Sequence, residues 1–320
     1  MKLGVFTVLF SDKPLPEVLD YIRNLGVEMV ELGTGNYPGE AHVPREKLLE
    51  DRGEREKFLK EIEDRGLKIS ALSCHGNPLH PDPEIREEHR KVQRETILLA
   101  NKLGVEVVIT FSGCPGDHEG AKYPNWVTCP WPEDFLAILS YQWDREAIPY
   151  WRDEAEFARE QGVKIALEMH PGFLVYNPET LLKLRDACGD NIGANLDPSH
   201  LFWQGIDPLK AIRVLEGAIF HVHAKDTRID SWNTPVNGVL DIKHYSKVKE
   251  RSWVFRTVGY GHDYGFWKDF VSLLRETGYD YVLSIEHEDS LMSPREGFEK
   301  AVKFLKEILI QEKPGEMWWA

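Results

Sequence analysis

Eight short β-rich runs recur along the chain, and segments with helical periodicity lie between them. The runs are LGVFTVLF (3–10), MVELGTG (29–35), KISALSCHG (68–76), VEVVITFSG (105–113), KIALEMHPG (164–172), IGANLDPSH (192–200), IFHVHAKD (219–226) and YVLSIEHED (281–289). Several of the helical segments end in Gly, which stops a helix because it readily adopts positive φ. Alternating strands and helices of this number predict a closed (β/α)8 barrel.

The competing architecture is a doubly wound open sheet. That fold usually carries a glycine-rich phosphate loop that leads from its first strand into a helix. The glycine-rich segment GTGNYPGE (33–40) does not open directly into a helix, so it is a weak candidate. No linker or low-complexity stretch divides the chain, and we therefore expect residues 1–320 to form a single TIM-barrel domain.

Two connections are longer than the few residues that usually join a strand to its helix. They cover 114–132 after the fourth strand and 227–263 after the seventh. Both contain several aromatic residues, which disordered loops rarely do. Because barrel enzymes build their sites at the C-terminal ends of the strands, we expect both segments to be ordered covers over the barrel mouth.

Composition limits the partners and the compartment. The net charge is −14, from 39 basic and 53 acidic residues, which argues against nucleic acid or an anionic membrane as the main partner. Four cysteines form no CxxC pair, and the apolar N-terminal run is too short to span a bilayer. We therefore expect a reduced, cytoplasmic protein. The tail at about 312–320 carries two tryptophans and is predicted to pack on the barrel or on a neighbouring subunit, as in a homodimer or homotetramer.

Strand parity places polar side chains inside the barrel. Side chains alternate across a strand, and in the fifth run the apolar set suits the outer helices while the polar set faces the axis. The inward residues of the last four strands are then Ala166, Glu168 and His170; Asn195 and Asp197; His221 and His223; and Ser284, Glu286 and Glu288. Four adjacent strands thus each send an ionisable group inward near their C-terminal ends.

Three inward carboxylates are unfavourable unless a cation or hydrogen bonds compensate them. A divalent metal ion held by Glu168, Asp197, His223 and Glu286 would do so. The alternative is that each group is satisfied separately, for example by a salt bridge between a glutamate and Lys225. Three oxygens and one imidazole suit Mn²⁺, Mg²⁺ or Co²⁺ better than a thiolate zinc site, although Zn²⁺ also fits. The prediction is one divalent ion, with Mn²⁺ as the first choice.

The chain resembles the xylose isomerase-like TIM-barrel superfamily, in particular the sugar phosphate isomerase/epimerase group with its ketose 3-epimerases and inositol-catabolism enzymes. The resemblance rests on VELG (30–33), ALEMHPG (166–172), NLDPSH (195–200), HVHAKD (221–226), GYGHDYGFW (259–267) and SIEHE (284–288). It implies the same four metal ligands, with Glu168 and Glu286 as the acid/base pair. It also implies substrate contacts by His200 and by a basic residue after the metal histidine. Lys225 and Arg228 stand there, although their spacing departs from the ketose 3-epimerase pattern.

Other residues near the strand ends are weaker candidates for substrate contacts. They are His75, His170, Trp126, Trp203 and Arg256. Each has an ordinary structural alternative: a local hydrogen bond, aromatic packing or a salt bridge. For Glu31 on the second strand, we favour a role as the buried partner of a histidine.

These residues suit proton transfer next to a carbonyl. The metal would stabilise the developing enediolate while one glutamate removes the proton and the other returns it. The outcome is epimerisation, isomerisation or elimination from a keto-sugar. The leading hypothesis is a metal-dependent isomerase or epimerase of a small carbohydrate, with a keto-glycoside lyase as the nearest rival. An apurinic-site DNA endonuclease would need more histidines and a basic groove, and a non-catalytic metal- or sugar-binding protein would need no paired glutamates.

Overall fold

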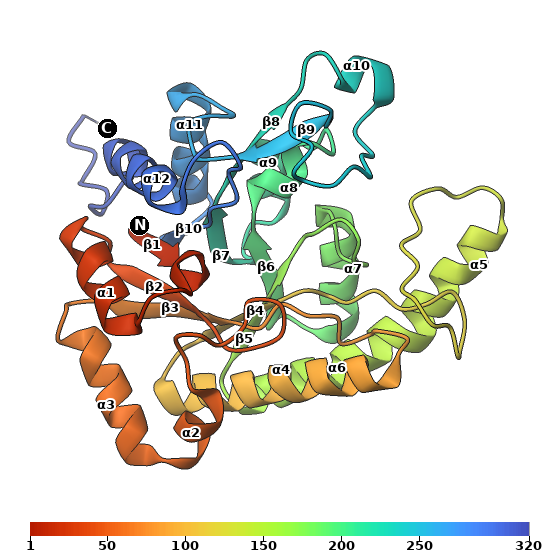
Figure 1. Cartoon of the computed structure of the whole chain (residues 1–320), viewed down its shortest axis with the longest axis horizontal. Helices are drawn as coiled ribbons and strands as arrows, with labels where there is room; N and C mark the ends of the chain where they lie inside the picture. The colour runs from red at the N-terminus through yellow and green to blue at the C-terminus, as the bar shows by residue number, and fades with distance from the viewer. Residues whose placement is uncertain (320) are drawn as a thin grey trace.

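Eight parallel strands close into a barrel in the computed structural model, which describes residues 1–319 (Figure 1). Around the barrel they are β1 (Lys2–Phe6), β2 (Met29–Gly33), β3 (Lys68–Ser73), β4 (Val107–Thr110), β5 (Lys164–Glu168), β6 (Ile192–Leu196), β7 (Ile219–Ala224) and β10 (Val282–Ile285), and β10 pairs with β1. The predicted (β/α)8 TIM barrel is confirmed. Because all strands are parallel, their C-terminal ends meet at one end of the barrel, which we call the mouth.

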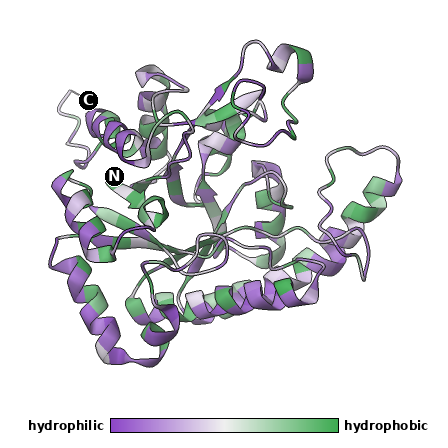
Figure 2. Ribbon diagram, in the orientation of Figure 1, coloured by the Kyte–Doolittle hydropathy of each residue, from purple (hydrophilic) through white to green (hydrophobic). Residues whose placement is uncertain are grey.

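Amphipathic helices cover the outside of the barrel. They are α1 (Leu15–Asn24), α3 (Arg52–Glu63), α4 (Pro83–Leu103), α6 (Ile148–Glu160), α7 (Pro178–Cys188), α9 (Pro208–Val214), α11 (Tyr264–Glu276) and α12 (Pro294–Ile308). In α12, Phe298, Ala301, Val302 and Leu305 are buried, which is the spacing of one helix face. Figure 2 shows the complementary pattern, with hydrophilic residues prominent on outer helices such as α3 and α4.

Short helices fill the connections. They are η1 (Thr7–Phe10), α2 (Arg45–Glu50), α5 (Asp134–Ser140), η2 (Tyr141–Ala147), α8 (Pro198–Phe202) and α10 (Thr234–Asn237). Two of them shorten predicted strands. The first strand ends at Phe6 instead of residue 10, and the sixth ends at Leu196 because Asp197 caps α8 and Pro198 fixes a helical φ at its start.

The two long connections form arms beside the mouth, with α5 and α10 near their tips (Figure 1). The arm after β7 contains an antiparallel hairpin of β8 (Asp226–Ile229) and β9 (Trp253–Arg256). The prediction of an ordered segment is therefore correct, but the strand pairing was not foreseen. Each strand has only four residues, and residues 230–252 separate them, so neither periodicity nor a turn motif identified the pair.

The C-terminal tail does not pack on its own barrel over 312–319. Trp318 is 87% exposed and Trp319 is 69% exposed. Contact with a neighbouring subunit, and hence a homodimer or homotetramer, stays a prediction, as does the single domain over 1–320. Among residues 1–319, the helices are either too short or too polar to cross a membrane.

Candidate active site and metal centre

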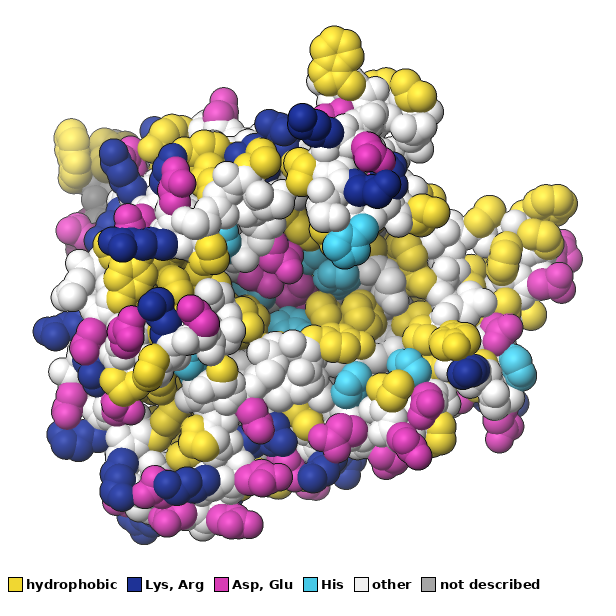
Figure 3. Space-filling view, in the orientation of Figure 1, with side chains coloured by type: hydrophobic (Ala, Val, Ile, Leu, Met, Phe, Trp, Pro, Cys, Tyr) yellow, Lys and Arg dark blue, Asp and Glu magenta, His cyan; other side chains and the backbone are white. Residues whose placement is uncertain are grey.

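The four predicted metal ligands lie together at the mouth. One donor atom from each of Glu168, Asp197, His223 and Glu286 lies within 4.8 Å of the others. The Nδ1 atom of His223 is 3.2 Å from a carboxylate oxygen of Glu168, 3.1 Å from one of Glu286 and 4.0 Å from one of Asp197. Figure 3 shows acidic and histidine side chains gathered in the hollow near the centre of this face. Strand parity thus places these four residues in one cluster.

Sheet register explains why the ligands converge. Glu168 is the last residue of β5 and pairs with Asn195, which in turn pairs with His221. On the other side of β7, His223 pairs with Ser284. Neighbouring strands therefore present their inward side chains at similar heights, and the ligands come from the last residues of the strands or from the residues just beyond them.

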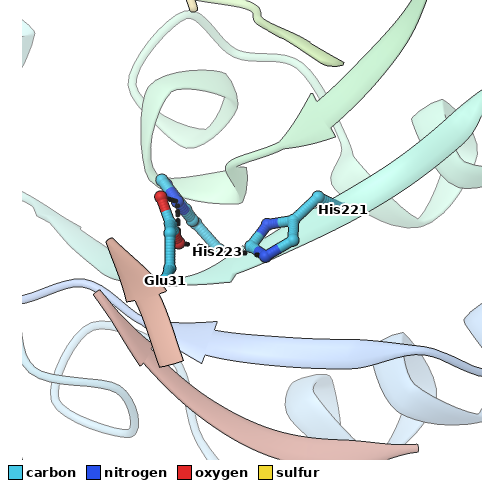
Figure 4. Close-up of side chains that lie close together, drawn as sticks. All are labelled: Glu31, His221 and His223. Atoms are coloured by element: carbon cyan, nitrogen blue, oxygen red, sulfur yellow. Dashed lines mark hydrogen bonds and ion pairs between the residues drawn. The ribbon is translucent and has the colours of Figure 1, made fainter. Parts of the chain in front are cut away.

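Glu31 holds the imidazole ring of His223 from the opposite side of the barrel. The Nε2 atom of His223 lies 3.0 and 3.1 Å from the two carboxylate oxygens of Glu31, as Figure 4 shows. Glu31 is fully buried and also accepts hydrogen bonds from the hydroxyls of Ser73 (2.6 Å) and Ser284 (2.7 Å). Its interpretation as the buried partner of a histidine is confirmed. The ring is fixed with Nδ1 facing the three carboxylates. In metal sites a histidine is often oriented in this way by a carboxylate on its other ring nitrogen.

A second buried pair links the cluster to the barrel interior. The Nδ1 atom of His221 lies 2.9 Å from the side-chain oxygen of Asn195, and the amide of Asn195 donates to Glu168 at 2.9 Å. His221 also has its Nε2 atom 3.9 Å from Glu31 (Figure 4). Both ends of Asn195 are therefore used, which fixes one oxygen of Glu168.

The pKa values in the cluster reflect its excess of negative charge. Burial would lower the pKa of His223, but Glu31 and Glu286 raise it well above its ordinary value. Burial raises the pKa of Asp197 to about 6 despite the nearby His200. Without a metal, the cluster is thus balanced by protons on His223 and, in mildly acidic solution, on Asp197.

One carboxylate oxygen of Asp197 accepts no hydrogen bond in the described chain. Its Oδ1 atom accepts the backbone N–H of Ser199 at 2.8 Å, whereas its buried Oδ2 atom has no hydrogen-bond partner within residues 1–319. A buried carboxylate oxygen without a donor is costly. Three carboxylates, one of which has an oxygen without a hydrogen-bond partner, and an imidazole nitrogen oriented by Glu31 fit a divalent metal ion.

Three further predicted histidines lie at this cluster. The Nε2 atom of His75 is 3.1 Å from one oxygen of Glu168, and the Nε2 atom of His200 is 3.2 Å from the other. The ring of His170 lies 4.0 Å from that of His200, between ring centroids. Burial alone would raise the pKa of Glu168, but His200, His223 and His75 hold it well below its ordinary value. Glu168 is therefore an ionised carboxylate.

Lys225 is the cation beside Glu286, the other acid/base candidate. Its Nζ atom lies 3.2 Å from Glu286 and 2.5 Å from Glu288, and 4.3 Å from the ring centroid of Phe255. Burial would lower the pKa of Lys225, but Glu286 and Glu288 raise it well above its ordinary value. Burial likewise opposes ionisation of Glu286, yet Lys225 and His223 hold its pKa below the ordinary value. Both acid/base candidates are thus kept ionised by neighbouring cations.

The two predicted tryptophans pack with other aromatic side chains. Trp203 is buried and stacks on Trp253 of the hairpin, with ring centroids 4.6 Å apart. Trp126 contacts Tyr176 edge to face at 5.5 Å. Neither indole N–H has a hydrogen-bond partner in the described chain. These contacts account for their packing, and their contact with substrate stays a prediction.

Arg228 and Arg256 lie outside the cluster, and their contact with substrate stays a prediction. In the hairpin, Phe255 pairs with Thr227, so both side chains lie on one face of the hairpin. That face points to the mouth, because the ring of Phe255 lies beside Lys225. Because side chains alternate, Arg256 and Arg228 belong to the opposite face. Arg256 forms a salt bridge with Asp289 at 2.9 Å, and Arg228 is exposed.

Sequence reasoning missed two aromatic residues that line the cluster. Phe6 stacks against His223 at a centroid distance of 6.0 Å, and Phe111 contacts His75 at 4.6 Å and His170 at 4.9 Å. Phe6 is the last residue of β1, and Phe111 directly follows β4. The strand-end test that identified the charged ligands would have found them had it been applied to apolar side chains.

Comparison with known proteins gives consistent relatives. The family model described as xylose isomerase-like TIM barrel matches residues 19–308. The uncharacterized protein YfiH of Bacillus subtilis is 41% identical, over 97% of this chain and 100% of its own length. An inosose dehydratase of Bacillus cereus is 29% identical over 98% of both chains.

Solved structures show the same fold. The IolI protein with a bound zinc atom superposes with a TM-score of 0.66 at 18% identity, over 97% of this chain and 98% of that one. A xylose isomerase-like TIM-barrel protein from Mycobacterium smegmatis in complex with magnesium has a TM-score of 0.63 at 20% identity, over 97% and 98%. At these identities the likeness concerns the fold alone.

Proposed function

Because the chain belongs to the xylose isomerase-like TIM-barrel family, we propose that it is a divalent-metal-dependent isomerase or epimerase of a small carbohydrate. The observation that carries the proposal is the cluster of Glu168, Asp197, His223 and Glu286 at the mouth, with its orphaned carboxylate oxygen. The zinc and magnesium of the two solved structures support a divalent ion, and Mn²⁺ is the ion we propose to test first.

The bound ion would supply Lewis-acid stabilisation of the negative charge that develops on the carbonyl oxygen of a hydroxy-ketone. Glu168 and Glu286 lie on neighbouring sides of His223, 3.2 and 3.1 Å from its Nδ1 atom. Both are ionised, so either can remove the proton next to the carbonyl, and the other can return one. Return to the same carbon from the opposite face is epimerisation. Return to the neighbouring carbon, with transfer of a proton between the two oxygens, is isomerisation.

The surrounding groups hold the two glutamates in their charged form. His75 and His200 each approach a different oxygen of Glu168, and Lys225 contacts Glu286. These partners keep each carboxylate charged before reaction and remain beside it when it takes up a proton. Phe6 packs against the ring of His223. The substrate enters from the open mouth.

A second candidate reaction is elimination. The observation that favours it is the full-length similarity to an inosose dehydratase. Dehydration begins with the same proton removal by a glutamate. The hydroxyl on the carbon next to the deprotonated one then leaves as water, with a proton returned by a protonated glutamate. A keto-glycoside lyase would release an alcohol or sugar in the same way. Neither reaction needs residues other than those that epimerisation uses.

Solvent exchange tests the shared first step. The protein is loaded in turn with Mn²⁺, Mg²⁺, Co²⁺ and Zn²⁺ and incubated in D₂O with ketoses, inososes and keto-glycosides. We expect deuterium to enter at least one class only when metal is present, as followed by NMR. Product mass then separates the reactions, because isomers keep the mass of the substrate and elimination products do not. Absence of exchange with every metal and class would refute the proposal.

Replacing Glu31 by glutamine is expected to weaken metal binding by roughly 10–100-fold. The amide no longer accepts a charged hydrogen bond from His223, so the imidazole is less basic and its orientation is less strongly fixed. Titration calorimetry with Mn²⁺ measures the change. The control is Glu28→Gln, since Glu28 pairs with Lys2 at the surface. Equal affinities of Glu31→Gln and the parent protein would contradict the role.

A further inference from the structure

Backbone N–H groups converge on one carboxylate just beyond the seventh strand. The Oδ2 atom of Asp226 accepts N–H groups from Gly259 (3.1 Å), Gly261 (3.0 Å) and His262 (2.9 Å). These three residues lie between β9 and the start of α11. Several N–H groups that point to one spot beside the start of a helix form an anion-binding nest.

Asp226 fills this nest completely. Its Oδ2 atom also accepts the indole N–H of Trp267 at 3.3 Å. Its Oδ1 atom accepts the backbone N–H of Thr227 and lies 2.8 Å from the Nδ1 atom of His262. Asp226 is fully buried, and a Cβ atom on Gly261 would lie 2.4 Å from its Oδ1 atom. The glycine at 261 is thus required for the close approach.

The position of the nest matters because of the fold. TIM-barrel enzymes that act on phosphorylated substrates frequently bind the phosphate with the loops after strands 7 and 8 and a nearby helix N-terminus. Here the corresponding N–H groups already bind a carboxylate from the same chain. A phosphate would have to displace that charged carboxylate, which is held by six hydrogen-bond donors.

The cations near the mouth are also engaged. Lys225 pairs with Glu286 and Glu288, and Arg256 pairs with Asp289. Arg228 is exposed on the face of the hairpin opposite the one that carries Phe255. Phosphate recognition relies on Arg, Lys and backbone N–H groups. The nest at Asp226, Lys225 and Arg256 are occupied by carboxylates, and Arg228 is turned away.

We infer that the substrate is not phosphorylated: the site takes a neutral keto-sugar or keto-cyclitol. This inference rests on the proposed function, and it names the class of compound that the function uses. A neutral polyol needs only the metal ligands, the histidines around Glu168 and Lys225, and it brings no further negative charge to a mouth that already holds Glu168, Asp197, Glu286 and Glu288.

A matched pair of substrates tests the inference on the metal-loaded protein. Each ketose or inosose is compared with its own phosphate ester by deuterium exchange. We expect kcat/KM to favour the free compound by at least about 100-fold, the discrimination of roughly 3 kcal/mol that an unpaired buried charge imposes. A phosphate ester that exchanges as fast as the free compound, or faster, would overturn the inference and leave the proposed function intact.

If no compound exchanges deuterium, the proposed function is refuted. A binding measurement can then still test whether the site accepts a phosphate group. Sulfate is used as a phosphate mimic in a thermal melt of the metal-loaded protein, with chloride at matched ionic strength as the reference. We expect millimolar sulfate to leave the Tm of the parent protein unchanged. A saturable rise in that Tm at millimolar sulfate would overturn the inference, because it would show that the parent protein has an open anion site.

Asp226→Ala supplies the positive control for the nest. Removal of the carboxylate frees the N–H groups of Gly259, Gly261 and His262, so sulfate is expected to raise the Tm of this variant by several degrees. Asp269→Ala is the comparison, because Asp269 is exposed within the body of α11 and lies outside the nest; sulfate should not stabilise it. A folded Asp226→Ala protein that ignores sulfate would contradict the assignment of the nest, and the parent protein alone decides the matter if the variant does not fold.

Discussion

Replacing Glu286 by glutamine is expected to lower the rate of deuterium exchange into the substrate by roughly 10²–10⁴-fold, the usual contribution of a positioned proton-transfer group. The amide keeps the shape of the side chain and an oxygen for the metal, but it cannot take up a proton at neutral pH. Glu286 lies 3.1 Å from His223 and 3.2 Å from Lys225, so both neighbours remain to hold the amide in place. The same loss is expected for Glu168→Gln.

Glu288→Gln is the matched control for this result. Glu288 stands two residues further along the same segment and also contacts Lys225, but its side chain is 51% exposed and it is not among the four clustered ligands. We expect less than a tenfold change in its exchange rate. Metal content must be measured in every variant, because a lost ion would mimic a lost base. A fully loaded Glu286→Gln protein with near-parental exchange would show that this glutamate moves no proton.

Periodicity and parity explain why so much was predictable. The number of βα units depends on patterns repeated over the whole chain, and the barrel they predict is the one observed. The position of Glu168, Asp197, His223 and Glu286 follows from a simple rule: parallel strands end at the same rim, and alternate side chains face inward. Register differences of one residue between neighbouring strands do not disturb it, because Glu168 and His223 are within two residues of the ends of their strands, and Asp197 and Glu286 directly follow theirs.

Parity was applied to the barrel strands and gave no position for residues beyond them. Arg228 was expected near the substrate because it shortly follows the metal histidine, and Arg256 because it precedes TVGYGH (257–262). Both belong to the β8–β9 hairpin, where alternation is set by the pairing of Thr227 with Phe255. That pairing joins segments separated by residues 230–252, so no local pattern encodes it. The role of Asp226 was hidden for the same reason, since its donors come from residues about 35 positions later.

Replacing Asp197 by asparagine is expected to have opposite effects on two properties. Metal affinity should fall by more than the roughly 10–100-fold that loss of an outer-sphere partner costs, because a charged ligand is lost. The metal-free protein should become more stable by about 3 kcal/mol at neutral pH, because the variant no longer buries a carboxylate whose Oδ2 atom lacks a hydrogen bond and whose charge is only partly offset by His200 and Lys225. Asparagine can still accept the N–H of Ser199 and cap α8. Calorimetric titration and urea unfolding measure the two changes.

Asp207→Asn is the matched control for Asp197→Asn. Asp207 also precedes a proline, caps its helix (α9) through the N–H two residues on, and lies at the surface. Its replacement should change stability by no more than about 0.5 kcal/mol and leave metal binding unaltered. Any larger stabilisation of Asp207→Asn would mean that the gain in Asp197→Asn reflects the cap rather than the buried charge.

The pH dependence of stability in the metal-free protein gives this prediction its sharpest test. Burial raises the pKa of Asp197 from 3.8 to about 6. Between these values the folded chain holds a proton on Asp197 that the unfolded chain has lost, so this group lowers the free energy of unfolding as pH rises through the window. Asparagine does not titrate, and the gap between parent and variant should therefore open across the window and reach its full size above about pH 6. A gap of constant size from one end of the window to the other would mean that the carboxylate of Asp197 is not the buried charge that a metal ion is needed to neutralise.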